Sequence, residues 1–303
     1  MDARPLGLTV GPLMFPWTKE RIAEFYQRLA EAAPVERVVI GELVCSKRLP
    51  FYEDVLPEAI ERLQRAGKRV AITSLALPTL MRERDAAKEL FRSGVEVELN
   101  DLSALGASDG KAFTVGPLIN VYNEATLGFL VQRGAKAFCL PPELPFASIE
   151  ILSHAAMTLN AGVEVWAYGR APLAISVRCY HARIHGLSKD SCRFVCAADP
   201  DGLPVRTVDG RDFLAINGVQ TLSYTHVNLI GDVKKLAAAG VASLRLSPHS
   251  GDFIALTKLF HAAIAGEISA SEAFARAQKL APQAAFSHGF AFGAYGAEPL
   301  AAG

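Results

Sequence analysis

The strongest constraint on the fold is a repeated alternation of short β-branched runs with amphipathic stretches of helical length. Eight strand candidates occur along the 303 residues, and the intervening segments have the length of crossover connections between parallel strands. This rhythm predicts a TIM-type (β/α)8 barrel, which typically needs about 250 residues for its eight βα units. The strand candidates are residues 6–13, 36–43, 68–75, 95–100, 112–118, 135–141, 163–169 and 241–247.

One connection is much longer than the others. Residues 170–226 separate the seventh strand candidate from a helix that we expect to begin near Val227. A DG pair and an NG pair flank RDFLAI (211–216), which predicts a small β-hairpin within this insertion. No linker divides the chain, so we expect a single barrel domain over residues 1–303. A long loop after a barrel strand is expected to carry function.

Charge and composition narrow the expected partners. The 31 basic and 31 acidic residues cancel, and no run of like charges indicates binding to nucleic acid or to an anionic membrane. No stretch of about 18 residues is apolar throughout, and the first residues lack the basic and apolar regions of a signal peptide. We therefore expect a cytoplasmic chain without a transmembrane segment, whose partners are small molecules or other proteins.

Four of the five cysteines occur where a metal site can form. Cys179, Cys192 and Cys196 lie in the long insertion, and Cys45 follows the second strand candidate. A reducing cytoplasm keeps thiols free, so clustered cysteines usually indicate metal binding or catalysis. The carboxyl ends of parallel barrel strands share one mouth, so the loops after strands two and seven can bring four thiols together. Cys139 lies within a strand candidate and is interpreted as a core residue.

Four thiolates suit more than one metal group. They can hold a [4Fe–4S] or a [2Fe–2S] cluster, and they also suit zinc. His181 and His185 lie beside Cys179 at helical spacing, so a mixed cysteine and histidine zinc site is also possible. A supporting role is favoured for both histidines, because four cysteines already complete a tetrahedral set. Three basic residues flank the thiols and would offset the negative charge of a cluster, namely Arg178, Lys189 and Arg193.

Other polar residues at the predicted barrel mouth are candidates for contact with a substrate or partner. They are Glu42, Asn120, Tyr168 and Arg170, which follow or end strand candidates. Arg170 is the best placed of these to bind an anionic group, and its alternative is to pair with a carboxylate of the protein. For Asn120, which lies in a predicted turn, structural hydrogen bonding is the favoured interpretation.

Three segments give the chain a family resemblance: GPLINVYN (116–123), VEVWAYGRAPLAISVRC (163–179) and SHGFAFGAYG (287–296). They resemble the collagenase-like peptidase superfamily, and the resemblance covers nearly the whole chain. The spacing of the last three cysteines, with an isolated fourth after strand two, is similar to that of one member of the UbiU/UbiV branch of this superfamily, whose other member arranges its cysteines differently. This branch acts in ubiquinone biosynthesis.

The resemblance implies a specific function. It implies a [4Fe–4S] cluster on Cys45, Cys179, Cys192 and Cys196, a heterodimer with a UbiU-like protein, and help from a UbiT-like lipid-binding accessory protein. The complex would support oxygen-independent hydroxylation of the ring of a ubiquinone precursor. The superfamily name also suggests a peptidase, although the sequence contains no HExxH, no GxSxG and no evident trio of serine, histidine and acid. A peptidase and a zinc-stabilised scaffold are therefore the alternatives.

Overall fold

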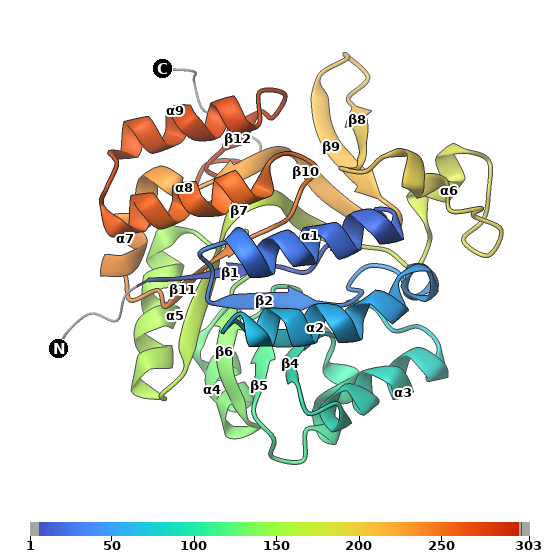
Figure 1. The fold of residues 1–303 in the computed structure, drawn as a ribbon, viewed down its shortest axis with the longest axis horizontal. Helices are drawn as coiled ribbons and strands as arrows, with labels where there is room; N and C mark the ends of the chain where they lie inside the picture. The colour runs from blue at the N-terminus through green and yellow to red at the C-terminus, as the bar shows by residue number, and fades with distance from the viewer. Residues whose placement is uncertain (1–5, 297, 299–303) are drawn as a thin grey trace.

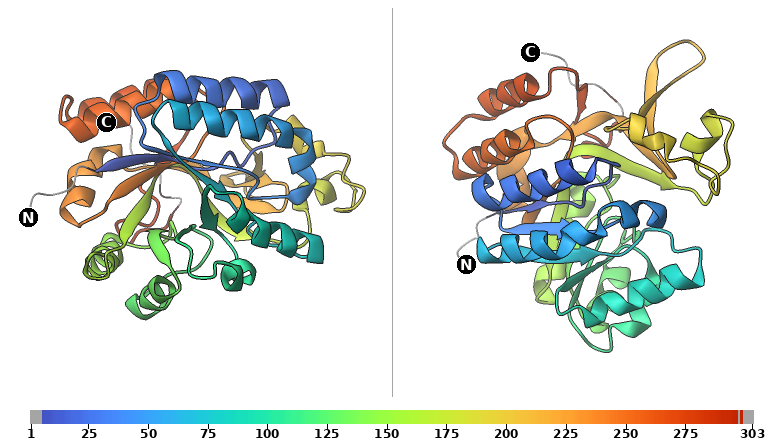
Figure 2. Two further views of the ribbon diagram at one scale, coloured as in Figure 1. Left: turned by 60° about the horizontal axis from the view of Figure 1, so that its bottom comes forward. Right: turned by 45° about the vertical axis from the view of Figure 1, so that its right-hand side comes forward.

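The protein folds as an eight-stranded parallel barrel enclosed by helices. The computed structural model describes residues 6–296 and 298, and Figures 1 and 2 show the helices arranged around the central strands. The strands pair in the order β1 to β7 and then β11, and β11 pairs with β1 to close the ring. This confirms the predicted barrel and its eight strands. They are β1 (Gly7–Val10), β2 (Arg37–Ile40), β3 (Arg69–Thr73), β4 (Glu96–Leu99), β5 (Phe113–Val115), β6 (Ala135–Cys139), β7 (Gly162–Ile175) and β11 (Ser243–Leu246).

The helices cover the outside of the barrel with amphipathic faces. In α1 (Lys19–Ala32), Ile22, Phe25 and Leu29 recur at helical spacing and are buried, and the Thr18 side chain caps the first turn. Within residues 6–296 and 298, none of the helices combines the length and apolar character needed to cross a membrane. The other helices are α2 (Leu56–Arg65), α3 (Met81–Glu89), α4 (Glu124–Gln132), α5 (Phe146–Thr158), α7 (Val233–Ala238), α8 (Phe253–Ala265) and α9 (Ala270–Leu280), with short 3-10 helices η1 (Ser46–Phe51), η2 (Glu53–Val55), η3 (Leu90–Arg92) and η4 (Leu102–Ala107).

The long insertion is built on an extension of the seventh strand. β7 continues beyond its pairing with β6 and β11 and pairs in antiparallel fashion with β10. β9 pairs with both β10 and β8, so the insertion carries a small antiparallel sheet, part of which projects at the upper right of Figure 1 beside α6. Its elements are α6 (Tyr180–Ile184), η5 (Val195–Ala198), β8 (Leu203–Arg206), β9 (Asp212–Asn217) and β10 (Gln220–Asn228).

The helix expected near Val227 was wrongly placed. Val227 lies in β10, opposite Gly169 of β7, and α7 begins at Val233 after η6 (Ile230–Asp232). The segment QTLSYTHVN has β-branched and aromatic residues typical of a strand, and the extended β7 supplies its pairing partner. A further short strand, β12 (Phe286–Ser287), pairs with β10 in parallel.

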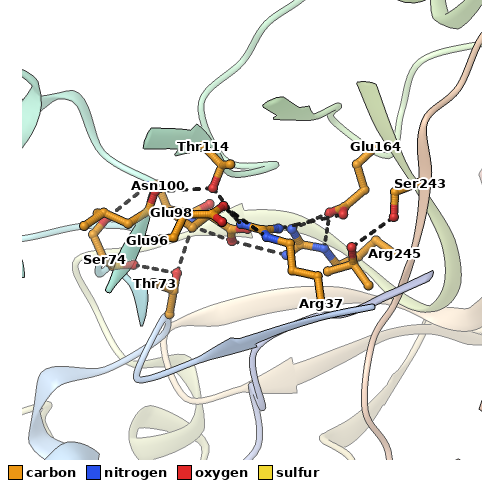
Figure 3. A network of polar contacts seen from close by, with 12 residues as sticks. Arg37, Thr73, Ser74, Glu96, Glu98, Asn100, Thr114, Glu164, Ser243 and Arg245 are labelled. Carbon is orange, nitrogen blue, oxygen red and sulfur yellow. Dashed lines mark hydrogen bonds and ion pairs between the residues drawn. The ribbon is translucent and has the colours of Figure 1, made fainter. Parts of the chain in front are cut away.

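A buried charge network lies inside the barrel (Figure 3). Arg245 of β11 bonds Glu98 of β4, with 3.2 Å from Nη1 to Oε1, and also pairs with Glu164 of β7. Arg37 of β2 lies 2.8 Å from Glu96 and within 3.8 Å of both Glu98 and Glu164. Arg37, Glu98, Glu164 and Arg245 are all buried. We call these residues the barrel charge network, and its opposite charges are paired within the protein.

Candidate metal centre

All four cysteines that the sequence singles out line one small cavity, which we call the cysteine cavity. Cys45 lies just before η1, Cys179 precedes α6, Cys192 lies in the following loop and Cys196 lies in η5. The cavity is tight, with a volume of about 20 Å³. The structure therefore brings the loop after β2 to the insertion after β7, as convergence of these thiols requires.

A buried carboxylate positions Cys45. Glu42 accepts hydrogen bonds through Oε1 from the backbone N–H groups of Val44 at 2.8 Å and Cys45 at 2.9 Å. Its Oε2 accepts from the Tyr52 hydroxyl at 2.9 Å. Burial raises the pKa of Glu42, and the charge of Arg48 opposes that shift. Both oxygens are thus engaged within the loop, and Glu42 holds the backbone on which Cys45 sits.

The chain between Cys192 and Cys196 forms a strained turn instead of the helix that a CxxxC spacing permits. Arg193 and Phe194 have φ angles of 49° and 54°, in the left-handed region. Such conformations cost non-glycine residues about 1–3 kcal/mol each and occur often at functional sites. Phe194 packs against Phe51 of η1, with 4.6 Å between ring centroids, so the turn is fixed against the loop that carries Cys45.

Basic side chains surround the thiols. Arg48 is buried and donates to the Met14 carbonyl and to Asn217 Oδ1, both at 2.8 Å, and its Nε has no partner among the described residues. Lys47 Nζ lies 3.6 Å from Cys192 Sγ. These two cations line the cavity directly and can offset the charge of thiolates there.

Gly218 permits the close approach of Arg48 to the cavity. It has a φ of 64°, and a Cβ at this position would lie 2.6 Å from Arg48 Nη2.

Burial raises the pKa of both the Cys45 and the Cys179 thiols, and the nearby Cys196 raises that of Cys179 further. The positive charge of Arg48 opposes the shift at both thiols.

The donor set fits an iron–sulfur cluster. Four thiols around one cavity can each bind a different iron of a cubane, and the basic side chains can balance its charge. The backbone N–H of Ala182 lies 3.4 Å from Cys179 Sγ, and hydrogen bonds of this kind tune such clusters. In the part of the chain that the structure describes, no three His, Cys, Asp or Glu side chains form a group suited to a single metal ion.

The two histidines differ in their relation to the cavity. His181 lines it, is fully buried, and pairs through Nε2 with Asp199 at 2.9 Å. Burial lowers the pKa of His181, although Asp199 opposes this. His181 Nδ1 has no hydrogen-bond partner among the described residues. His185 is not among the cavity residues and stacks on the His181 ring at 5.8 Å.

The other predicted contact residues lie apart from the cysteine cavity. Arg170 donates through Nη1 to the carbonyls of Ser223, at 2.9 Å, and Tyr224. Asn120 is exposed in the segment before α4. The Tyr168 hydroxyl is buried without a partner among the described residues, as is Arg170 Nε.

Two histidines that the sequence did not single out lie beside Tyr168. The ring centroids of His226 and His249 are 6.1 and 5.5 Å from that of Tyr168. Burial lowers the pKa of both histidines and raises that of Tyr168. His226 pairs with Arg170 across the β7–β10 ladder, which the sequence analysis did not anticipate. Recognising QTLSYTHVN as a strand is the signal that could have found it.

Fold and site together define a (β/α)8 barrel protein with a cysteine-lined cavity formed by the loop after strand two and the insertion after strand seven. The chain belongs to Peptidase family U32, whose family model matches residues 18–300. This match confirms the resemblance to the collagenase-like superfamily.

Comparison with solved structures gives only distant likenesses. The tryptophan synthase complex from Pyrococcus furiosus is 12% identical, with 91% of this chain and 96% of that chain covered and a TM-score of 0.42. A protein from Clostridium thermocellum that binds two copies of 5-methyl-5,6,7,8-tetrahydrofolic acid is 11% identical over 86% and 94%, with a TM-score of 0.42. An enolase from Agrobacterium radiobacter is 12% identical over 53% of this chain, which spans only 44% of that enolase, with a TM-score of 0.37.

Proposed function

We propose that this chain is an iron–sulfur protein of the UbiV type, with one [4Fe–4S] cluster on Cys45, Cys179, Cys192 and Cys196. The observation that supports this most directly is that these four thiols line one cavity while Cys139 does not. Membership of Peptidase family U32 is consistent with this branch, because the UbiU/UbiV proteins resemble the same superfamily.

A cluster with four cysteine ligands would supply one-electron transfer or structural support. The protein's own groups would hold and tune it. Arg48 and Lys47 place positive charge beside the thiolates, and the Ala182 N–H donates to Cys179 Sγ. Glu42 and the strained turn at Arg193 hold the ligand-bearing backbone in position.

The proposal includes the partners that the resemblance implies. The chain would form a heterodimer with a UbiU-like protein and, with a UbiT-like accessory protein, support oxygen-independent hydroxylation of a ubiquinone precursor. Action on such a precursor would take place in the cytoplasm.

Anaerobic purification with the UbiU-like partner tests the metal centre. Iron, sulfide and zinc are measured per chain together with the visible absorption spectrum, and we expect about four irons and four sulfides, bleached by dithionite. Cys192→Ala should abolish the visible band and lower anaerobic ubiquinone synthesis. Cys139→Ala is the matched control, because Cys139 lies in β6 away from the cavity, and it should retain both.

A zinc-stabilised scaffold is the first alternative, and the unpartnered Nδ1 of His181 at the cavity favours testing it. Stoichiometric zinc with no visible band would replace the iron–sulfur proposal. If the unmodified protein holds a full cluster but the cysteine variants lose no ubiquinone synthesis, the metal centre is supported and its role in ubiquinone synthesis is overturned.

A peptidase is the second alternative, favoured by the family to which the chain belongs. The test is cleavage of casein or collagen peptides by the purified protein, before and after removal of bound metal. Cleavage that survives metal removal would favour the peptidase. No cleavage in either state would leave the iron–sulfur proposal in place.

A further inference from the structure

A second, larger cavity adjoins the cysteine cavity. It has a volume of about 620 Å³, within the range of small-molecule sites. It lies among η1, the start of α3 and the segment that runs from the end of β7 through α6 into the following loop. Cys179, Lys47 and Lys189 line both cavities. We call the larger one the cationic groove, and a molecule bound in it would lie against the Cys179 side of the cysteine cavity.

The groove concentrates positive charge in a chain whose total charge is balanced. Its walls carry two acidic residues against five basic ones. Among residues 6–296 and 298, the ion pairs are formed by basic residues outside the groove. Four basic side chains of the groove are therefore free to meet an external anion, namely Arg82, Arg178, Arg183 and Lys189. The fifth basic residue, Lys47, donates to the carbonyls of Lys189 at 2.8 Å and Asp190 at 3.2 Å.

One of the two acidic residues, Glu83, contributes negative charge but forms no ion pair with the described basic residues of the groove, because its oxygens accept hydrogen bonds locally. Glu83 Oε2 accepts from the backbone N–H groups of Thr79 at 2.7 Å and Leu80 at 2.9 Å, and Oε1 accepts from the Ser46 hydroxyl. Glu83 thereby caps the start of α3. The second acid, Asp190, is the only other carboxylate among the groove residues.

The groove also has apolar walls. Val177 is 58% exposed and Leu80 is 45% exposed, and Leu187 lines the same space. Exposed apolar side chains beside unpaired guanidinium groups match a ligand with an apolar skeleton and an anionic group. Guanidinium groups bind carboxylate and phosphate oxygens in pairs, which gives orientation as well as affinity.

We propose that the cationic groove binds a small organic anion, with a carboxylate or phosphate group on an apolar skeleton, next to Cys179. The anionic group is held by Arg178 and Arg183, and the skeleton lies on Val177 and Leu80. The inference goes beyond the metal centre, since the binding surface consists of side chains that are present with or without a cluster.

Binding is tested by isothermal titration of the protein, purified anaerobically with its metal, against four matched probes. Phenyl phosphate and benzoate should bind, and benzyl alcohol and benzylamine should bind at least about tenfold more weakly because they lack the charge that the groove recognises. Affinity for the two anions should fall with added salt. Equal affinity for benzyl alcohol and phenyl phosphate would overturn the proposal.

A charge-reversed variant locates the site. Arg178→Glu with Arg183→Glu should weaken phenyl phosphate at least about tenfold, and Arg276→Glu on the exposed surface of α9 is the control that should leave affinity unchanged. Unchanged affinity for phenyl phosphate in the folded double variant would overturn the proposal. Binding of the protein to phosphatidylglycerol vesicles without any binding of soluble anions would also overturn it. Iron and sulfide content measured on the same sample keeps a failure of the metal centre distinguishable from a failure of the groove.

Discussion

The barrel charge network and the cysteine cavity are both polar regions within the fold, but only one is complete. In the network, Arg37 and Arg245 each meet more than one carboxylate within 4 Å, and all of these contacts are internal. In the cysteine cavity, four thiols lie beside the buried Arg48, and none of the described residues that line the cavity is a carboxylate. A polar region whose charges are paired internally stabilises one structure. The cysteine cavity has no such internal pairing, and under the proposed function the cluster would supply it.

The largest expected effect is on the barrel charge network. Glu98→Ala would leave Arg245 and Arg37 buried with fewer partners, and the free energy of unfolding should fall by about 3–5 kcal/mol. Urea denaturation measures it. Glu89→Ala is the control, because Glu89 pairs with Arg92 at the surface, and it should change stability by less than about 1 kcal/mol. Equal effects would mean that the buried network is not a distinct stabilising unit.

A smaller effect is expected at the cysteine cavity. Gly218→Ala forces a side chain into the left-handed region and toward Arg48, and should cost about 1–3 kcal/mol of stability. Gly210→Ala is the matched control, because Gly210 has a φ of 83° but nothing within 4 Å of its Cβ position. If urea denaturation gives the same loss for both, the contact with Arg48 has no energetic consequence. A lower iron content in the Gly218 variant alone would link that contact to the metal centre.

A pH effect is expected where β7 leaves the barrel. Burial holds the pKa of His226 well below its usual value, so the unfolded chain binds the proton more readily than the folded chain. Stability should therefore fall as the pH drops below about 6.5, with a slope of at most about 1.4 kcal/mol per pH unit from this one group. His226→Gln should flatten the stability profile measured by urea denaturation between pH 7 and 5. The exposed His261→Gln should leave it unchanged, and a flat profile in the unmodified protein would contradict the prediction.

The smallest effect should be a gain in stability. Arg193 is exposed and has a φ of 49°, so Arg193→Gly relieves a left-handed conformation and should stabilise the protein by about 0.5–1 kcal/mol. Arg178→Gly changes the same residue type where φ is not positive, and it should be neutral or destabilising. Thermal unfolding of both variants measures the difference. A loss of stability at both positions would show that the turn before Cys196 is not strained.

The barrel could be predicted from the sequence because short strand-like runs, most of them containing β-branched residues, alternate regularly with helical stretches. The convergence of Cys45 with Cys179 followed from the same topology, since both come after barrel strands. β10 was missed because its partner is the extension of β7 through Arg170 and Pro172, whose Gly, Arg and Pro residues look like a loop in sequence. Only tertiary pairing makes that segment a strand.

The barrel charge network could not be predicted for a different reason. Glu98 and Arg245 occupy strand positions where a polar residue usually faces solvent. They are also separated by 147 positions in the sequence. Nothing local distinguishes a buried ion pair from two surface charges. His226 and His249 were missed similarly, because their common neighbour Tyr168 is far from both in the chain.

The contact between Lys47 and Cys192 also joins two residues that are synthesised at different times. These residues are separated by 145 positions, and at a synthesis rate of about 5–20 residues per second roughly 7 to 30 s pass between their emergence from a ribosome. The cysteine cavity cannot form during that interval, because Cys192 and Cys196 are part of its lining. Under the proposed function, the cluster could therefore be loaded only after the insertion that follows β7 has been synthesised, well after Cys45.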